Sequence, residues 1–361
     1  MKNLSLTLGV SALAFVLAGA DAQAYTWWKC GTTNVKWAAN AVTLRASQVG
    51  FPSGNPYRTA LGGVATRWSN TPSKMNYFIQ YDEPGVAEGN GQSEVWWTAP
   101  PSISAPAYAK IWWNGSCQIT EGDVVFNNTV SYTPYTTKST LTPYGGAYRP
   151  FGTTAMHELG HVQGLGHTTT TYSIMGQDWD HIHANGSAAT AYPGEDAVGG
   201  SVAVYGLDAA NVQDLGVSQW RYTGSSGGYS THSRTRLFTT GNVELTKVVG
   251  TAEPTYRVNK GQQVKLEMTY ENMGKTSPLT VKVGYYLSTN DLISTADTFL
   301  GEGTVTLYRG VPDTTYNTYL WIPSYLTSGA TYYLGAIIDY NSTLAEVYES
   351  NNATYLAIRI N

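Results

Sequence analysis

The sequence has 361 residues, of which 13% are charged, and its formal net charge is −4 at pH 7. This charged fraction is about half the usual share, which excludes a disordered acidic tail, and there is no basic excess to form a nucleic-acid-binding face. At about 150 residues per domain the length suggests two domains, and 42% apolar residues suffice for sizeable cores. The 27 tyrosines and 38 glycines favour a β-rich, loop-rich structure, because aromatic residues suit sheets and glycine suits turns.

Residues 1–24 are predicted to be a secretory signal peptide. Lys2 begins the segment, residues 4–20 form an apolar run, and residues 22–24 (Ala-Gln-Ala) match the small-x-small cleavage pattern. The alternative is a membrane anchor, but the run is at the short end of what spans a bilayer, and no later run is apolar for long enough. We therefore expect a secreted, extracellular protein with no membrane span after the signal is removed.

Two cysteines, Cys30 and Cys117, follow the signal. Export leads to an oxidising compartment, where an even pair usually forms a disulfide, so one bond between them is the first interpretation. The second is that the Cys30 thiol, between Lys29 and Gly31, caps a metal as an inhibitory ligand.

The sequence of the next 200 residues predicts both strands and helices. Strands are expected within 34–50 and at 75–81, 94–98, 107–113 and 121–127, with a long surface loop at 128–150. Pro56 opens a helical pattern, in which apolar residues recur at spacings of three and four up to Trp68. Further helices are expected from Thr153 and around 196–205.

The composition and the residue pattern change after this region. Residues 223–240 are predicted to be a linker, because 223–235 is rich in glycine and serine. Residues 241–361 contain alternating runs separated by turn signals, which predicts an all-β sandwich. The runs are 263–270, 279–287, 331–339 and 354–360.

Three of the six histidines fall in residues 157–167, whose sequence is HELGHVQGLGH. On a helix, His157 and His161 share one face, so both can bind the same ion, and Gly164 allows a turn that brings back His167 as a third ligand. Three protein ligands leave one position open for water, as in catalytic zinc sites. Glu158 is then the candidate general base. The alternative, a structural metal, would fill the fourth position with protein and would not need Glu158.

This motif resembles the extended zinc motif of the metzincin metallopeptidases. That family has a methionine turn beneath the zinc, and residues 173–176 (Ser-Ile-Met-Gly) are similar to it, with Met175 as the hydrophobic support. Astacins and serralysins have a tyrosine where Gln177 stands. The closer resemblance is to matrixins, through Trp68, the strand around Asp123, Thr168 after the third histidine, and the pair Glu195-Asp196.

The resemblance implies an α+β metzincin-type catalytic domain, with a twisted mixed sheet plus helices, over residues 25–222. It also implies that a peptide substrate lies extended along an edge strand at 107–113, with residues 176–195 as a pocket wall. Within that wall, His181 and His183 are either pocket residues or surface residues, and the surface role is favoured. Calcium is common in matrixins, so Ca²⁺ is an additional candidate, although no fixed-spacing calcium loop occurs.

The C-terminal region, 241–361, is similar to the CARDB module, an immunoglobulin-like domain proposed to act in bacterial cell adhesion. Its Asp339, Glu346 and Glu349 are either calcium ligands or solvated turn charges, and the second interpretation is favoured. The resemblance implies binding to cell-surface or matrix ligands.

Together these features predict a secreted, monomeric, zinc-dependent endopeptidase that acts on protein or peptide substrates. The C-terminal domain would serve adhesion or substrate targeting. The alternative is an adhesin or surface-binding protein with an inactive metzincin domain, and an intact Glu158 favours the enzyme.

Overall fold

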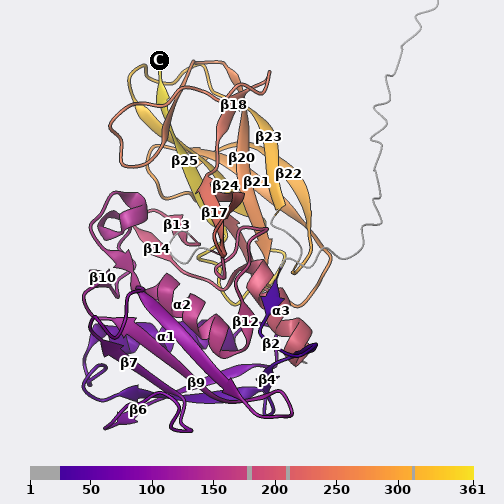
Figure 1. Ribbon diagram of the computed structural model, residues 1–361. Helices are drawn as coiled ribbons and strands as arrows, with labels where there is room; N and C mark the ends of the chain where they lie inside the picture. The colour runs from indigo at the N-terminus through magenta and orange to yellow at the C-terminus, as the bar shows by residue number, and fades with distance from the viewer. Residues whose placement is uncertain (1–24, 177–180, 209–211, 311–313) are drawn as a thin grey trace, which may run out of the picture.

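The computed structural model describes residues 25–176, 181–208, 212–310 and 314–361. The predicted signal peptide and Gln177 lie outside these residues. An N-terminal half that contains the helices lies against a β-sandwich formed by the rest of the chain (Figure 1). No helix in the described ranges is both long enough and apolar enough to cross a membrane.

A six-stranded mixed sheet forms the base of the N-terminal half (Figure 1). Five strands are parallel, in the order β4 (Lys36–Trp37), β9 (Gln118–Asn127), β7 (Glu94–Thr98), β5 (Ala41–Ser47) and β6 (Asn76–Glu83). The sixth strand, β8 (Ala107–Trp113), pairs antiparallel with β9. The strands expected at 75–81, 94–98, 107–113 and 121–127 are therefore present, and the first strand is shorter than the 34–50 segment that contains it.

Two helices, α1 (Pro56–Ser69) and α2 (Phe151–Val162), lie over this sheet, and α3 (Gly194–Tyr205) lies near the sandwich (Figure 1). Helix α1 starts where the sequence predicts, because the Asn55 side chain accepts a hydrogen bond from the Tyr57 backbone N–H and Pro56 occupies the first helical turn. Its buried face, Leu61, Val64, Ala65 and Trp68, joins the core between helices and sheet.

Short elements complete this half. They are β1 (Thr26–Trp27) paired with β12 (Leu165–Gly166), β2 (Lys29–Cys30) with β3 (Thr33–Asn34), β10 (Tyr132–Thr133) with β11 (Arg149–Pro150), and β13 (His183–Asn185) with β14 (Ala188–Thr190). The expected surface loop at 128–150 is wrong in part. It contains β10, the 3₁₀ turns Lys138–Thr140 and Thr142–Tyr144, and β11, and its Leu141 and Tyr144 form a small core with Ile182.

The sandwich has one five-stranded and one four-stranded sheet. The first has the order β19 (Thr255–Val258), β25 (Ala353–Ile360), β24 (Thr331–Ile338), β21 (Leu279–Ser288) and β22 (Thr298–Leu307). In the second, β20 (Gln263–Asn272) pairs with β15 (Leu215–Ser218), β18 (Leu237–Thr239) and β23 (Thr314–Trp321). The four alternating runs match β20, β21, β24 and β25, because period-2 patterning marks strands with one face in a core.

The predicted linker at 223–240 is wrong. Residues 220–234 form a hairpin of β16 (Trp220–Ser226) and β17 (Tyr229–Arg234), and β18 follows as a strand of the sandwich. Because β15 also pairs with β20, the sandwich begins before residue 222. A glycine-rich composition identified the turn, but it could not show that the flanking residues pair.

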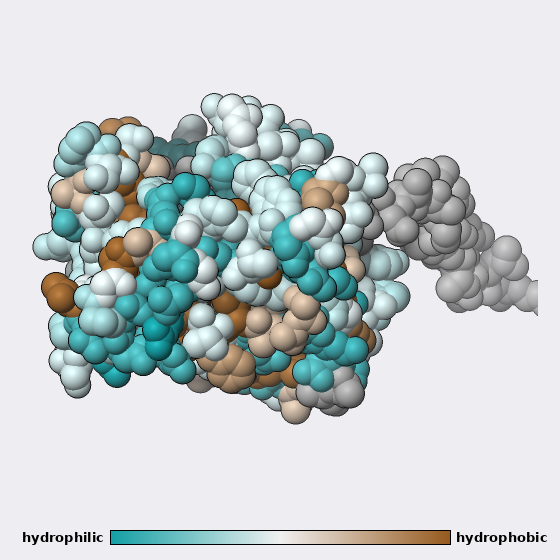
Figure 2. All heavy atoms as spheres, turned by 60° about the horizontal axis from the view of Figure 1, so that its bottom comes forward, coloured by the Kyte–Doolittle hydropathy of each residue, from teal (hydrophilic) through white to brown (hydrophobic). Residues whose placement is uncertain are grey.

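Figure 2 shows the sheet side of the N-terminal half as a space-filling surface. Hydrophilic and intermediate residues cover most of this face, and the hydrophobic residues form separate patches between them. Small exposed apolar patches of this kind are normal for a folded chain, since polar surface cannot cover a whole protein.

Candidate metal centre

Helix α2 carries the first part of the histidine motif through the interior of the N-terminal half. It begins directly after Pro150, and every residue from Thr153 to Val162 is buried. A helix that is buried on all sides lies inside a protein rather than on its surface. His157 and His161, one turn apart, therefore present their rings on the same side within the interior.

The chain turns at Gly164 to bring back His167. Gly164 has φ +96°, a conformation that glycine adopts readily, and a Cβ there would lie 2.6 Å from the Val35 carbonyl oxygen. Beyond it, β12 pairs with β1, and the Thr26 hydroxyl donates to the His167 carbonyl oxygen at 2.6 Å. The N-terminal strand thus positions the third histidine.

The three imidazoles converge on one point through their Nε2 atoms. His161 Nε2 lies 3.0 Å from His157 Nε2 and 3.1 Å from His167 Nε2. His157 Nδ1 donates to the Ile174 carbonyl oxygen at 2.7 Å, and His161 Nδ1 donates to the Leu165 carbonyl oxygen at 2.8 Å. With the proton on Nδ1, each of these two rings presents a lone pair on Nε2, as metal-binding histidines do.

Burial keeps both helix histidines uncharged at neutral pH. It lowers the pKa of His157 to about 3, and it lowers the pKa of His161 well below its usual value, with further contributions from His157 and His167. Neutral rings are required for metal binding, because a protonated Nε2 has no lone pair to donate.

Met175 packs under the histidine helix. It is buried, and its side chain lies so close to Gly160, between the two helix histidines, that a Cβ at Gly160 would be 2.3 Å from Sδ. The same turn supplies the Ile174 carbonyl that orients His157, and the Met175 carbonyl accepts from the Thr168 backbone N–H at 3.2 Å. Residues 173–176 thus support the histidine cluster from below.

Glu158 lines a pocket of about 260 Å³ beside the histidines, together with His157, Arg149 and Tyr229. Glu158 itself is only 5% exposed. Tyr229, at the start of β17, contacts the histidine cluster directly, with its ring centroid 4.2 Å from that of His167. Sequence reasoning missed Tyr229 because it assigned this segment to a linker, and the flanking Gly227 and Gly228 were the available signal of a hairpin turn.

Strand β8 runs past the cluster at the edge of the sheet. Residues 105–107 at its start line the Glu158 pocket. Farther along, Lys110 and Trp113 line a second pocket of about 210 Å³ with Trp28 and His161. Hollows therefore lie at both ends of the histidine cluster along one strand.

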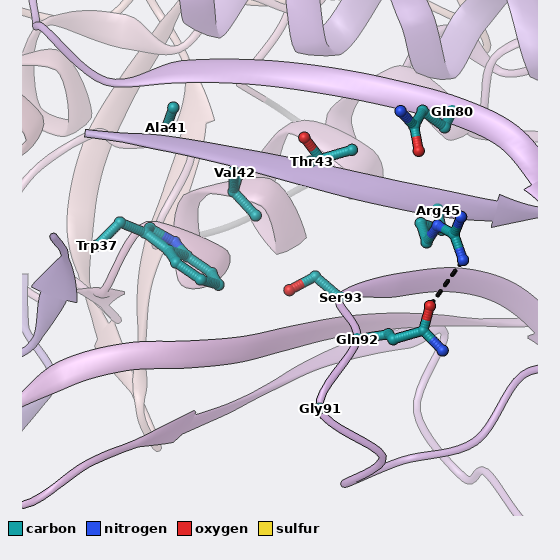
Figure 3. A pocket seen from close by; sticks show the side chains of 9 residues that line it. All are labelled: Trp37, Ala41, Val42, Thr43, Arg45, Gln80, Gly91, Gln92 and Ser93. Carbon is teal, nitrogen blue, oxygen red and sulfur yellow. Dashed lines mark hydrogen bonds between the residues drawn. The ribbon is translucent and has the colours of Figure 1, made fainter. Parts of the chain in front are cut away.

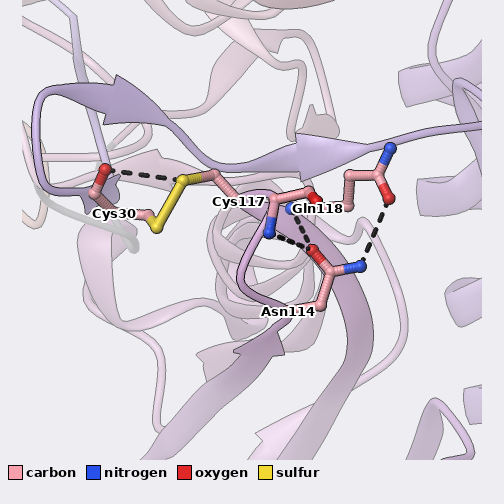
Figure 4. The surroundings of a disulfide bond; sticks show 5 residues. Cys30, Asn114, Cys117 and Gln118 are labelled. Carbon is pink, nitrogen blue, oxygen red and sulfur yellow. Dashed lines mark hydrogen bonds between the residues drawn. A yellow bond between two sulfur atoms is a disulfide. The ribbon is translucent and has the colours of Figure 1, made fainter.

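Cys30 and Cys117 form the predicted disulfide, with Cα atoms 5.5 Å apart (Figure 4). It joins β2 to the turn before β9, where the Asn114 side chain accepts hydrogen bonds from the backbone N–H groups of Ser116 and Gln118. The alternative role of Cys30 as a metal-capping thiol is wrong for this structure, because its sulfur is bonded to Cys117.

Another hollow, of about 450 Å³, lies between β5 and the loop before β7 (Figure 3). Its charged residue, Arg45, donates to Gln92 at 2.7 Å and to Glu83 at 2.9 Å. Arg45 already has these partners, the Ser93 hydroxyl accepts from the Gly122 backbone N–H at 3.0 Å, and no histidine or carboxylate lines this hollow, so it offers no evident chemistry.

The favoured surface role for His181 and His183 is wrong. Both are buried, and they meet Glu271 of β20, so that one potential ligand atom of each lies within 4.8 Å of the others. Sequence reasoning missed Glu271 because it lies 90 residues away in an ordinary alternating strand. No local pattern links the two segments.

The C-terminal carboxylates have protein donors. Asp339 is buried rather than solvated, and it accepts from the Thr343 hydroxyl at 2.6 Å and the Leu344 backbone N–H at 2.8 Å. Glu346 accepts from the Leu215 backbone N–H at 2.6 Å, and burial raises its pKa to about 7. These contacts fix the turn after β24, and a calcium site here stays a prediction.

No family model and no curated protein matches this sequence. Among solved structures, the chain is similar to a CARDB domain from Pyrococcus furiosus crystallised with di-metal ions, at 16% identity over 43% of this chain and 95% of that one, with a TM-score of 0.26. It also matches a β-glucosidase from Listeria innocua at 12% identity over 37% of this chain, with a TM-score of 0.20, and spans 17% of that enzyme. Neither similarity decides a function, which rests on the residues of this chain.

Proposed function

We propose that this protein is a secreted zinc-dependent endopeptidase that hydrolyses peptide bonds of extracellular proteins. The observation that carries the proposal is the convergence of three histidine Nε2 atoms beside a pocket lined by Glu158. The rings of His157 and His161 are buried and present Nε2 lone pairs to each other, an arrangement that a bound cation explains, because without one these lone pairs repel.

The residues present fit a zinc ion. Tetrahedral zinc with Zn–N bonds of about 2.0–2.1 Å requires ligand atoms about 3.3 Å apart, close to the 3.0 and 3.1 Å observed. His157, His161 and His167 would hold the ion and leave one position for water. When bound, zinc would supply Lewis acidity, which lowers the pKa of water and polarises a substrate carbonyl.

Glu158 is the proposed general base and acid. As the neighbour of His157 on α2, it lines the pocket where water and the substrate carbonyl would meet. Its carboxylate would take the proton of the attacking water and then deliver it to the leaving amine nitrogen, which must be protonated to depart.

The edge strand β8 is the proposed peptide-binding element. A peptide paired with the free edge of β8 would pass the histidines and reach the pockets at both ends of the cluster. Trp28 and Trp113 offer apolar walls for a side chain on one side of the scissile bond.

We further propose that the sandwich, through its resemblance to CARDB modules, targets the enzyme to cell surfaces or matrix. The test uses the full chain with Glu158→Ala, so that targets survive. Enrichment on cell surfaces or matrix proteins above an unrelated sandwich protein supports targeting, and no enrichment contradicts it.

The decisive experiment compares wild type, Glu158→Ala and the surface control Glu302→Gln on casein, gelatin and a peptide library. Glu158→Ala should lose hydrolysis by at least about 100-fold and keep its zinc, because the ligands remain. Glu302→Gln, in the sandwich, should match wild type. If zinc-loaded wild type cleaves none of these substrates, the endopeptidase proposal fails and the binding protein with an inactive metal domain takes its place.

A further inference from the structure

A second cluster of metal-binding side chains lies between the two halves of the molecule. His181 Nε2 lies 2.9 Å from Glu271 Oε1, and His183 Nε2 lies 2.9 Å from Glu271 Oε2. The three side chains are at most 1% exposed. One carboxylate therefore faces two imidazoles, one at each oxygen, with no access to solvent.

The protonation pattern of His183 leaves its Nε2 facing the carboxylate as an acceptor. Its Nδ1 lies 3.1 Å from the Val217 carbonyl oxygen, which can only accept, so Nδ1 carries the proton. Nε2 of the neutral ring and Glu271 Oε2 are then two acceptors 2.9 Å apart. Neither atom has a hydrogen-bond partner among the described residues, although the two lie 2.9 Å apart. Such a contact needs a cation or an extra proton.

The surroundings are shaped around these rings. A Cβ at Gly194 would lie 2.5 Å from His181 Nε2, and one at Gly216 would lie 2.8 Å from His183 Cε1. Tyr172 stacks on His181 with centroids 4.4 Å apart. Glycine on two sides and an aromatic ring on a third hold both imidazoles against Glu271.

We infer that His181, His183 and Glu271 form a second, structural zinc site that joins the two halves. The two imidazole nitrogens and both carboxylate oxygens supply four protein donors, and a buried site closed by protein ligands is the arrangement of structural rather than catalytic zinc. The 2.9 Å contacts are close to the 3.0 and 3.1 Å spacing of the first histidine cluster.

This site has a different task from the proposed catalytic centre. The histidines precede or belong to β13, whereas Glu271 belongs to β20 of the sandwich, so a bound ion would cross-link segments 88–90 residues apart. Because the ligands come together only in the folded protein, the free energy of zinc binding would add to the stability of the assembled molecule.

The test counts zinc in the full chain by mass spectrometry after dialysis against zinc and then buffer. Wild type should hold two ions and the double variant His157→Ala/His161→Ala one. Adding Glu271→Gln to the double variant should remove that ion. The double variant leaves the second cluster unchanged. The number of zinc ions that the double variant holds is therefore decisive even if the Glu271 variant does not fold. A double variant that holds no zinc overturns the inference.

A second measurement separates a metal from a shared proton. A chelator should lower the Tm of His157→Ala/His161→Ala by on the order of 10 °C if zinc binds tightly. Added Zn²⁺ should restore the original Tm. An unchanged Tm would indicate a protonated imidazole–carboxylate pair and overturn the inference. Failure of the catalytic proposal is distinct, since a wild type that holds two ions and cleaves no substrate contradicts the endopeptidase and leaves the second zinc site standing.

Discussion

At the residue scale, the structure explains why a glycine stands between two histidines in the middle of a helix. Glycine costs up to about 1 kcal/mol in a helix interior, so its presence at position 160 needs a reason. The reason is Met175, whose sulfur would be 2.3 Å from a Cβ at that position. The histidine helix and the methionine turn can approach this closely only without that carbon atom.

Gly160→Ala should therefore lower the free energy of unfolding by about 1–2 kcal/mol, because overpacking costs about 1–3 kcal/mol and helix propensity returns part of it. The displaced Met175 should also weaken zinc binding at His157 and His161. Chemical denaturation and zinc titration measure the two effects. The matched control is Gly63→Ala in α1, where a Cβ meets only Arg67 at 3.5 Å, so this variant should be slightly more stable than wild type. Equal stability of both variants would contradict the role of Met175.

At the element scale, the β16–β17 hairpin adds a tyrosine side chain to the candidate site. It replaces the expected linker and brings Tyr229 against His167, on the same pocket as Glu158. A phenol on the wall of such a pocket can donate a hydrogen bond to the carbonyl oxygen of a substrate as negative charge develops there.

Tyr229→Phe should thus lower kcat about 10- to 100-fold with the zinc content unchanged, since the ring remains and only the donor is lost. Steady-state kinetics on a peptide substrate provide the measurement. Tyr325→Phe, a change at an exposed tyrosine of the sandwich, is the control and should match wild type. A Tyr229→Phe enzyme with wild-type kcat would reduce Tyr229 to a packing residue.

At the scale of the whole molecule, the two halves are held together by more than the chain that connects them. The Thr354 hydroxyl donates to the Ala184 carbonyl oxygen at 2.7 Å, and Asn185 Nδ2 donates to the Ile293 carbonyl oxygen at 3.0 Å. Lys138, 9% exposed at its side chain, pairs with Asp291 and lies 3.1 Å from Glu253 of the sandwich half. Buried polar contacts of this kind favour a fixed arrangement over two independently moving domains.

Lys138→Met should lower the free energy of unfolding by about 2–3 kcal/mol, because it leaves two partly buried carboxylates without their cation. Urea denaturation measures this change. Lys282→Met removes an exposed ion pair with Glu302 and should leave the unfolding midpoint nearly unchanged, since water screens such pairs. If the two variants unfold at the same urea concentration, the Lys138 contacts do not hold the halves together.

Local patterns in the sequence were enough to predict features that depend on neighbouring residues. The 3.6-residue periodicity and Pro56 located α1, and alternation located the strands at 263–270 and 354–360. The spacing of His157, His161 and Gly164 predicted that three imidazoles would meet, and their rings do converge. These inferences succeed because the relevant geometry spans one helix and one turn.

The tertiary structure alone decided which distant segments meet. No period or motif connects His183 with Glu271, Tyr229 with His167, or Lys138 with Glu253, because each pair is brought together by the packing of separate elements. Burial has the same origin. The charges and imidazoles that looked suited to solvent in the sequence became interior groups with specific partners once the sandwich packed against the N-terminal half, and that packing created the second candidate zinc site.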